Sequence, residues 1–290
     1  MEQGFEKMNI QWFPGHMTKA RRMIEENIKL VDAVCEILDA RIPNASRNPD
    51  IDKLAGDKPR LVILNRCDLA DPEATARWHR YFQSQGLAIL ETDAKSGRGV
   101  GGFVPAVRAL LQDKLKEYES KGQVGRGLRV MILGIPNVGK STFINKVAGR
   151  KAAIAGDIPG VTRGKQWINI DRGLDLLDTP GILWPKFESQ EVGELLAITN
   201  AIKADVIDKE TLGANFMLRL QTYYPDALRS RYKLEPQPDC NGFELLELAA
   251  QKRGFLISKG EYDLERMANT LLKEYHEGKL GRLTLETPDD

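Results

Sequence analysis

A glycine-rich segment, Gly134 to Ser141, contains the residue types that bind phosphate groups. It reads GIPNVGKS, with an apolar run from Val130 to Leu133 before it and a helix-like stretch from Thr142 to Ala148 after it. A strand, a glycine-rich turn and a helix start are the context that the phosphate-binding pattern GxxxxGK[ST] requires. In that context, successive backbone N–H groups converge on phosphate oxygens at the positive end of the helix. We therefore predict that a nucleoside triphosphate binds here.

Four positions, two of them within this segment, have the chemistry to complete a phosphate and metal site. Lys140 would reach the β- and γ-phosphates, and the Ser141 hydroxyl would bind Mg²⁺. Asp178 follows the apolar run from Leu174 to Leu177 and is suited to hold Mg²⁺ or its water. Gly181 can bring a backbone N–H to the γ-phosphate, a contact that exists only before hydrolysis.

Neighbouring loop residues are expected to add contacts. Thr162 ends the segment PGVT and is suited to cover the metal and the γ-phosphate. Singly, each of these residues could be an ordinary turn position, but their order and distance behind the phosphate loop argue against that. The other loop residues that we expect to contact the nucleotide are Asn137, Val138, Gly139 and Thr142.

A polar segment much earlier in the chain can read a guanine base. Asn65-Arg66-Cys67-Asp68 resembles the tetrad NKxD, with Arg66 where lysine is usual. The Asp68 carboxylate can accept hydrogen bonds from guanine N1–H and N2–H₂, a donor pair that adenine lacks. Such a site can reject the wrong base by roughly 10⁴-fold or more, because its own polar groups would go unpaired. The lysine normally lays its stem over the base, and a guanidinium can stack there too.

A second segment, Asp93-Ala94-Lys95, resembles the other guanine loop, SAK. In that loop a backbone amide meets the base oxygen and the lysine stem packs nearby. Asp93 stands where serine is usual. Together the two segments favour GTP as the nucleotide.

The order of the segments is unlike that of ordinary small GTPases, because the base-reading segments precede the phosphate loop. Apolar runs at 34–38, 60–64 and 87–90 alternate with helix-like stretches, which indicates an α/β fold with a doubly wound parallel sheet. Ligands of such sheets bind at the carboxyl ends of the strands, where these polar segments fall. The same sheet can form in permuted order, since domain termini often lie close together.

Composition describes an ordinary globular protein of 290 residues, 42% hydrophobic and 29% charged. No apolar run approaches membrane-spanning length, and the start lacks a signal-peptide core. Cys35, Cys67 and Cys240 lie far apart without a metal-binding spacing, so we expect free thiols in a reducing cytosol. The formal net charge of +1 neither requires nor excludes a nucleic-acid partner.

Three parts are expected along the chain. An N-terminal segment and helix over 1–30 precede a nucleotide-binding domain over 31–204, and an all-helical domain follows over 205–290. Acidic residues outnumber basic ones in the last part, so any contact with RNA there must use a local patch. The candidate cations are Arg229, Arg231, Lys233, Lys252 and Arg253, with a solvated helix face as the alternative.

The motifs together resemble the circularly permuted GTPases of the bacterial ribosome-biogenesis GTPase A (YlqF/RbgA) family. The segments WFPGHM, GIPNVGKS, PGVT and DTPG carry the resemblance, which extends to the closing GKLGRLTLE. It implies a Ras-like fold in permuted order with a C-terminal domain similar to RNA-binding ANTAR modules. It also implies a cytoplasmic GTP hydrolase that acts in late assembly of the large ribosomal subunit and binds its RNA. We expect it to act as a monomer.

The group that positions the attacking water is not the usual one. Small GTPases commonly follow DxxG with a glutamine, but here Ile182 follows Gly181. His16 is the best remaining candidate, because neutral imidazole can orient or deprotonate water near pH 7. The resemblance implies the same role, since the histidine of WFPGHM is the family's proposed catalytic residue. The alternative is that His16 packs beside Trp12.

A monovalent ion is a further expectation. Asn137 stands where potassium-activated GTPases of similar loop sequence have a ligand to the ion. A K⁺ there could place positive charge where an arginine finger otherwise would. The alternative is that Asn137 only braces the loop.

Two other functions remain open on the sequence. A GTP-dependent RNA-binding module with negligible turnover would bind ribosomal subunits without being stimulated by them. A metabolic phosphotransferase would have an acceptor pocket and would tolerate other bases, which the base-reading segments argue against.

Asp68 gives the sharpest test of base specificity. We expect Asp68→Asn to exchange a preference for guanine for one for xanthine, because an amide can donate to xanthine O2 where a carboxylate could only repel it. Competition binding with GTP, XTP and ATP measures the exchange. Undiminished selectivity for GTP in the variant would contradict the assignment.

Overall fold

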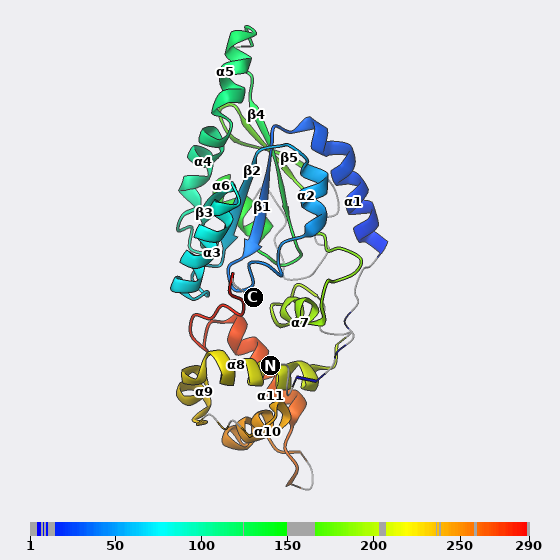
Figure 1. Ribbon diagram of the computed structural model, residues 1–290, viewed down its shortest axis with the longest axis vertical. Coiled ribbons are helices and arrows are strands. Elements are labelled where there is room, and N and C mark those ends of the chain that lie inside the picture. The colour runs from blue at the N-terminus through cyan, green and yellow to red at the C-terminus, as the bar shows by residue number, and fades with distance from the viewer. Residues whose placement is uncertain are drawn as a thin grey trace. The chain divides into compact units, whose positions relative to one another are not determined.

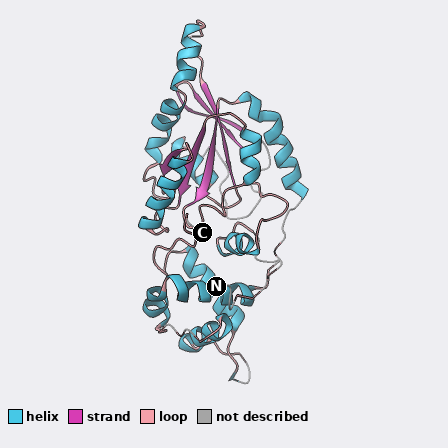
Figure 2. Ribbon diagram, viewed as in Figure 1, coloured by secondary structure: helices cyan, strands magenta, loops and turns pink. Residues whose placement is uncertain are grey.

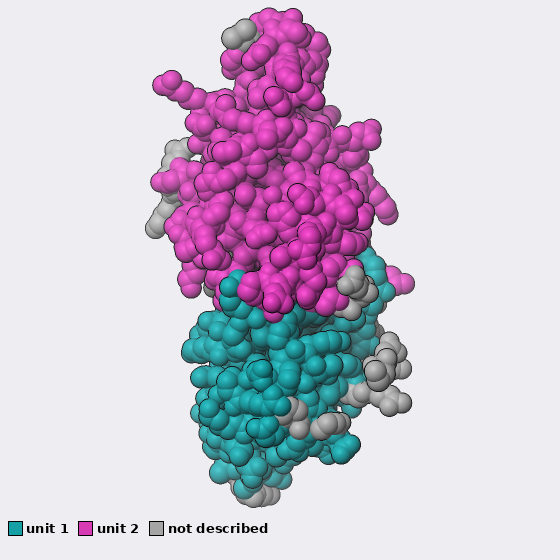
Figure 3. Space-filling model, turned by 60° about the vertical axis from the view of Figure 1, so that its left-hand side comes forward, with its two compact units in different colours: residues 1–11, 187–285 teal, residues 12–186, 286–290 magenta. Residues whose placement is uncertain are grey.

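A computed structural model of the chain describes residues 5–6, 8, 10, 15–123, 125–149, 166–202, 207–235, 237, 239–257 and 260–288. The side chain of His16 lies outside this description. Two compact units are distinguished in Figure 3. We call residues 12–186 with 286–290 the sheet unit, and residues 1–11 with 187–285 the helical unit.

The sheet unit is built on six strands in the spatial order β3-β2-β1-β4-β6-β5. Neighbouring strands are parallel except for β5, an edge strand that runs antiparallel to β6. The register pairs Asp39 with Asn65 and Ile37 with Gly134, so three strands end at the same edge. The strands are β1 (Ala33–Asp39), β2 (Arg60–Asn65), β3 (Ala88–Glu91), β4 (Leu128–Gly134), β5 (Gln166–Asp171) and β6 (Leu174–Asp178).

Helices cover both faces of this sheet, as Figure 2 shows, and the central strands are therefore almost wholly apolar. On one face, Ile24 and Ile51 pack with Val34 of β1, while Trp78 and Phe82 pack with Leu38. On the other side from α1 and α2 (Figure 1), α4 and α6 meet through the edge-to-face pair Phe103 and Phe143, with ring centroids 5.2 Å apart. The helices are α1 (Gly15–Asn27), η1 (Ile28–Leu30), α2 (Pro49–Ala55), α3 (Pro72–Ser84), η2 (Val100–Gly102), α4 (Phe103–Leu110), α5 (Gln112–Ser120) and α6 (Lys140–Val147).

The helical unit is organised around α8, which packs against α10 and α11. Its aromatic core includes Phe216 and Tyr275, whose ring centroids lie 5.0 Å apart. The N-terminal segment belongs to this unit, because the amide of Glu6 and the side chain of Asn215 exchange hydrogen bonds of 2.9 Å. The helices are α7 (Gln190–Ile198), α8 (Lys209–Tyr223), α9 (Pro225–Tyr232), α10 (Gly242–Arg253) and α11 (Leu264–His276).

The chain returns to the sheet unit at its end. The carboxylate of Glu286 accepts hydrogen bonds from the backbone amides of Asn44 and Ala45, at 2.8 and 2.9 Å, and Trp78 Nε1 donates to the Glu286 carbonyl at 3.2 Å. These contacts fix the loop that follows β1. They give Glu286, the last residue of the segment GKLGRLTLE, a structural role within the sheet unit.

The expected α/β class with a helical C-terminal part is confirmed, with three local differences. The antiparallel β5 arises because a tight turn at Arg172-Gly173 joins it to β6 as a hairpin, with Gly173 at φ +77°. The helix-like stretch after the apolar run at 87–90 forms two helices, α4 and α5, which are separated at Leu111. Helix α2, which begins at Pro49 after the capping side chain of Asn48, was not indicated by periodicity. The boundary between the two compact units lies after residue 186. The domains expected from the sequence, over 31–204 and 205–290, stay a prediction.

In the part of the chain that the structure describes, no helix combines the length and the apolar character needed to cross a membrane.

One buried acid interrupts the apolar central strand. Glu36 of β1 is 1% exposed, and burial raises its pKa to about 7, although Arg47 and the Asn48 amide act in the opposite direction. The Asn48 N–H donates to Glu36 Oε1 at 3.2 Å. Glu36 therefore holds the start of α2 against the sheet.

The stability of the sheet unit should depend on pH through Glu36. Its folded pKa of about 7 exceeds the usual 4.5, so the folded state binds more protons between these values and loses stability as pH rises through the window. A shift of this size corresponds to about 3 kcal/mol. We expect Glu36→Gln to flatten this dependence and to be the more stable form at pH 8.

Urea unfolding between pH 5 and 8, followed by tryptophan fluorescence, measures this effect. All 4 tryptophans lie within residues 12–186, so the signal reports on the sheet unit. Glu26→Gln, an exposed change on α1, is the matched control. Parallel pH profiles for the unchanged chain and Glu36→Gln would contradict the prediction.

Candidate nucleotide-binding site

The phosphate loop lies between β4 and α6, as the sequence predicts. Gly139 has φ +97°, and a Cβ there would collide with the side-chain nitrogen of Asn65. Only glycine fits this position, because of both the backbone angle and the close approach of Asn65. Asn137 also lies in the left-handed region, at φ +58°, which asparagine tolerates better than most residues. The loop is therefore fixed in a conformation that few sequences adopt.

Lys140 begins α6 and is buried at the mouth of the loop. Its Nζ lies 3.4 Å from the carbonyl oxygens of both Gly134 and Ile135. Burial lowers the pKa of Lys140 to about 8, and the Asp178 carboxylate partly offsets this effect. A bound phosphate would add negative charge beside the amine and so favour its protonated form.

Asp178 ends β6 and is buried, and burial raises its pKa despite the nearby Lys140 charge. Its Oδ1 has no hydrogen-bond partner among the described residues. A buried carboxylate oxygen without a donor suits a metal ion or the water that it carries. The residues therefore fit Mg²⁺, with Ser141 in the first turn of α6 as the other described candidate ligand.

The loop after β6 lies directly against the phosphate loop. The Thr179 hydroxyl donates to the Ile132 carbonyl at 2.8 Å, and the Ile182 N–H donates to the Gly134 carbonyl at 3.3 Å. A Cβ on Gly181 would lie 2.9 Å from Pro136 Cα and 3.1 Å from Lys140 Nζ. Gly181 thus allows the close approach that a γ-phosphate contact needs.

Asn65 joins the base-reading segments to the phosphate loop. Its Nδ2 donates to the Val138 carbonyl at 2.9 Å, while its Oδ1 accepts from Thr92 Oγ1 at 3.1 Å and from the Ala94 N–H at 3.0 Å. The side chain is 2% exposed. One buried amide therefore connects three loops that are far apart in the sequence.

The other base-reading residues divide into structural and accessible groups. Cys67 is buried, which raises the pKa of its thiol to about 12, and its N–H donates to the Thr92 carbonyl at 3.1 Å. Asp68 is half-buried, and its carboxylate has no hydrogen-bond partner among the described residues. Lys95 is exposed. Asp68 and Lys95 are thus open to a base.

Asp93, where serine is usual, has a structural role. Its Oδ1 accepts from the backbone amides of Lys95 and Ser96 at 3.0 and 3.1 Å. Burial alone would raise the pKa of Asp93, but the hydrogen bonds from Ser96 and Lys95 outweigh it and hold the pKa below its usual value. The acid closes the turn that a serine would otherwise close.

Three predicted residues lie partly or wholly outside the described part of the chain. His16 lies in the first turn of α1, but its side chain is outside the described residues, and Trp12 and Thr162 lie outside them altogether. Arg66 donates from Nη2 to the Asn137 carbonyl at 2.5 Å. Its Nε lies 3.7 Å from Asp39 Oδ2. Asp39 was missed at the sequence level, although it follows a predicted strand as Asp68 and Asp178 do.

The cations expected to contact RNA are largely engaged within the helical unit. Arg231 and Arg253 both pair with Glu274, at 2.5 and 3.1 Å, and the Tyr232 hydroxyl donates to the same carboxylate at 2.7 Å. Arg229 pairs with Asp226 and Glu235, and Lys233 Nζ donates to the Ser230 carbonyl. These contacts within the unit would compete with contacts to a phosphate backbone.

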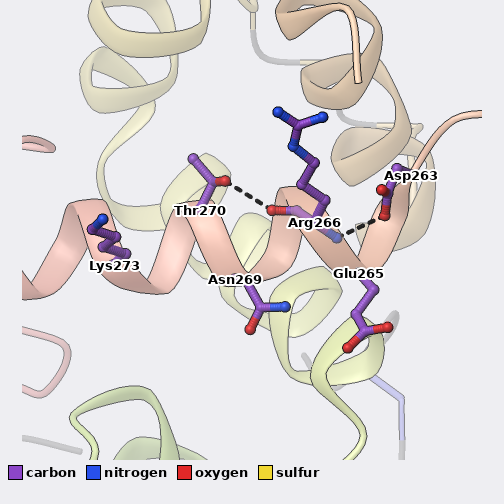
Figure 4. Close-up of a pocket in the computed structure, with 6 residues that line it drawn as sticks. All are labelled: Asp263, Glu265, Arg266, Asn269, Thr270 and Lys273. Atoms are coloured by element: carbon purple, nitrogen blue, oxygen red, sulfur yellow. Dashed lines mark hydrogen bonds between the residues drawn. The ribbon is translucent and has the colours of Figure 1, made fainter. Parts of the chain in front are cut away.

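A shallow hollow of about 390 Å³ lies along α11 (Figure 4). Both charge signs are present, and Asp263 caps the helix by accepting from the Arg266 N–H at 2.9 Å. It has none of the glycine-rich backbone of the phosphate loop. Its lining residues are Asp263, Glu265, Arg266, Asn269, Thr270 and Lys273.

Comparisons with known proteins agree with this geometry. The family model described as 50S ribosome-binding GTPase matches residues 129–215. The chain is 45% identical over 284 residues to ribosome biogenesis GTPase A of Priestia megaterium, covering 98% of each, and 44% identical to that of Bacillus cereus, covering 98% and 95%. A crystal structure of GNP-bound YlqF from T. maritima matches with a TM-score of 0.66 at 28% identity, over 94% of this chain and 99% of that one.

Asn65 offers a direct test of the site. Asn65→Ala leaves the Val138 carbonyl, the Thr92 hydroxyl and the Ala94 amide without their partner, at about 1–3 kcal/mol for each buried group. We expect GDP to bind at least ~10-fold more weakly, as measured by fluorescence of a labelled nucleotide. Asn169→Ala, on the exposed edge strand, is the control. Unchanged GDP affinity in Asn65→Ala would show that other contacts hold the loops together.

Proposed function

Because the chain belongs to the ribosome biogenesis GTPase A family, we propose that it hydrolyses GTP to GDP and phosphate as a switch in late assembly of the large ribosomal subunit. The observation that carries the proposal is the single side chain of Asn65, which joins a guanine-type tetrad to a phosphate loop. That joining gives base reading and phosphate binding one common site.

In this proposal the loops share the work on the nucleotide. Asp68 reads the guanine edge, and the backbone of the loop around Ala94 meets the base oxygen. Lys140 holds the β- and γ-phosphates, and its amine becomes fully charged when phosphate arrives. The Gly181 N–H contacts the γ-phosphate and releases it after hydrolysis, which makes the Asp178–Ile182 loop the switch.

Two metal sites are part of the proposal. Ser141, Thr162 and Asp178 would hold Mg²⁺, which when bound neutralises the charge of the phosphates. The unpartnered buried Oδ1 of Asp178 supports this ligand set. Asn137 would hold K⁺, and its left-handed backbone keeps it within the loop that surrounds the phosphates.

The partner is a precursor of the large ribosomal subunit, bound through its RNA in the cytoplasm by a monomeric protein. Since Arg231 and Arg253 pair with Glu274, the RNA contact in the helical unit would use other cations. Lys252, and Arg266 with Lys273 on the hollow of α11 (Figure 4), are the best placed of these. Such a small local patch is consistent with the excess of acidic over basic residues in 205–290.

Turnover of GTP and ATP, each with and without large ribosomal subunits, tests the function. We expect hydrolysis of GTP alone and a rise of at least ~10-fold when subunits are added. Binding of subunits in the GTP form without any rise would favour the RNA-binding module with negligible turnover. Equal turnover of GTP and ATP would contradict the proposal.

His16 is proposed to orient the attacking water. We expect His16→Ala to lower subunit-stimulated kcat by at least ~10-fold while GTP affinity and subunit binding stay unchanged, because only a transition-state contact is lost. The measurement is steady-state phosphate release with saturating subunits. His79→Ala, at a half-buried histidine of α3 that pairs with Glu91, is the matched control. Normal turnover of His16→Ala would assign the water to another group.

Potassium activation gives a separate prediction. We expect GTP turnover to be several-fold faster in KCl than in NaCl at matched ionic strength, because the bound ion adds positive charge beside the phosphates. Asn137→Ala should remove the difference between the salts. Equal rates in the two salts for the unchanged chain would reject the ion.

A further inference from the structure

The departure from the lysine tetrad at Arg66 is accompanied by a buried carboxylate on the neighbouring strand. We propose that Asp39 is a positioning residue for the nucleotide site, which acts by holding Arg66 on the carbonyl of the phosphate-loop residue Asn137. The proposal rests on the proposed nucleotide site. It adds Asp39, which lies outside the base-reading segments, the phosphate loop and the loop after β6.

Asp39 is well placed to carry a negative charge. It ends β1 directly opposite Asn65, is 2% exposed, and is paired with the fully buried Arg41. Arg41 Nη2 donates to Oδ2 at 2.7 Å, and its Nε and backbone N donate to Oδ1 at 2.9 and 3.0 Å. Burial would raise the pKa of Asp39, but Arg41 and then Arg66 outweigh it and lower the pKa. The carboxylate is therefore ionised beside Arg66.

Arg66 uses two parts of its guanidinium at once. Its backbone is left-handed, with φ +65°, an uncommon conformation for a residue with a long side chain. Nη2 donates to the Asn137 carbonyl at 2.5 Å, while Nε faces Asp39 Oδ2 at 3.7 Å. A planar guanidinium presents donors in several fixed directions, whereas a lysine ammonium is a single point. Arg66 and Asp39 therefore act together, because the carboxylate positions the guanidinium that holds the Asn137 carbonyl.

The pair of Asp39 and Arg66 affects the backbone amides that would bind phosphate. A trans peptide is planar, so holding the Asn137 carbonyl also fixes the Val138 N–H, which points the opposite way. The Val138 carbonyl is held in turn by Asn65 at 2.9 Å, which fixes the Gly139 N–H. Two neighbouring residues of the tetrad thus hold two successive carbonyls of the loop. Loss of either contact should loosen the amides that meet the phosphates.

The buried pair can be replaced without leaving an uncompensated charge. Asp39→Asn together with Arg41→Met removes both charges at similar volume, a type of change that is often neutral for stability. We expect GDP release to become ~10-fold faster in this variant when Arg66 is present. In an Arg66→Lys background the same replacement should change the release rate less than ~2-fold, because the carboxylate then has no guanidinium to position.

Release of a fluorescent GDP by stopped flow measures all four forms, and tryptophan fluorescence confirms that each is folded at the assay temperature. Equal acceleration with Arg66 unchanged and in the Arg66→Lys background would show that the pair supports only the fold. No acceleration with Arg66 unchanged would overturn the proposal outright. Asp32→Asn, which changes an acid at the opposite end of β1, is the matched control, with GDP release unchanged.

Arg66→Lys alone decides the question even where the pair replacement fails to fold. We expect it to release GDP ~5-fold faster, since a lysine cannot face Asp39 and the Asn137 carbonyl together. Release as slow as in the unchanged chain would overturn the proposal. Competition between GDP and ADP on the unchanged chain reports separately on the nucleotide site, so failure of that assignment is distinguishable from failure of the Asp39 role.

Discussion

Two side chains from the end of β2 hold two successive carbonyls of the phosphate loop, and the nucleotide site depends on this arrangement. Asn65 holds Val138 and Arg66 holds Asn137, at 2.9 and 2.5 Å. Because each peptide is planar, these contacts orient the amides that a phosphate would accept from. The same Asn65 amide accepts from the 92–94 loop. Base and phosphate loops are therefore one rigid assembly, although they lie far apart along the chain.

This arrangement depends on the register of the sheet, and it includes local features that are unfavourable in free energy. The carboxyl ends of β1, β2 and β4 coincide, which brings Asp39, Asn65 and Gly134 to one edge. Left-handed backbone at Arg66 and Asn137 and the burial of Lys140 and Asp178 each cost the folded state free energy. A ligand that binds only the folded state adds about 4 kcal/mol at a thousand times its Kd. Nucleotide binding and folding of this unit are thus coupled.

Much of this was predictable from local pattern. The mostly apolar strands, the glycine-rich loop and the polar residues after each strand were recognisable, because burial on both faces and backbone approach to phosphate restrict the residue types allowed. The role of Asp39 was not, since its partner Arg66 is adjacent only through β-strand register. The pairing of Arg231 and Arg253 with Glu274 was not predictable either, because Glu274 comes from a helix distant in the sequence. The contact of Glu286 with the loop after β1 was equally invisible in the sequence.

Amide hydrogen exchange of the unchanged chain, with saturating GDP and with saturating ADP, tests the single-site account most directly. If one rigid assembly binds the nucleotide, GDP should slow exchange together at 65–68, 92–95, 134–141 and 178–182, while ADP should protect none of these segments to the same extent. Protection limited to 134–141, or equal with both nucleotides, would contradict a site in which the tetrad reads guanine and holds the phosphate loop.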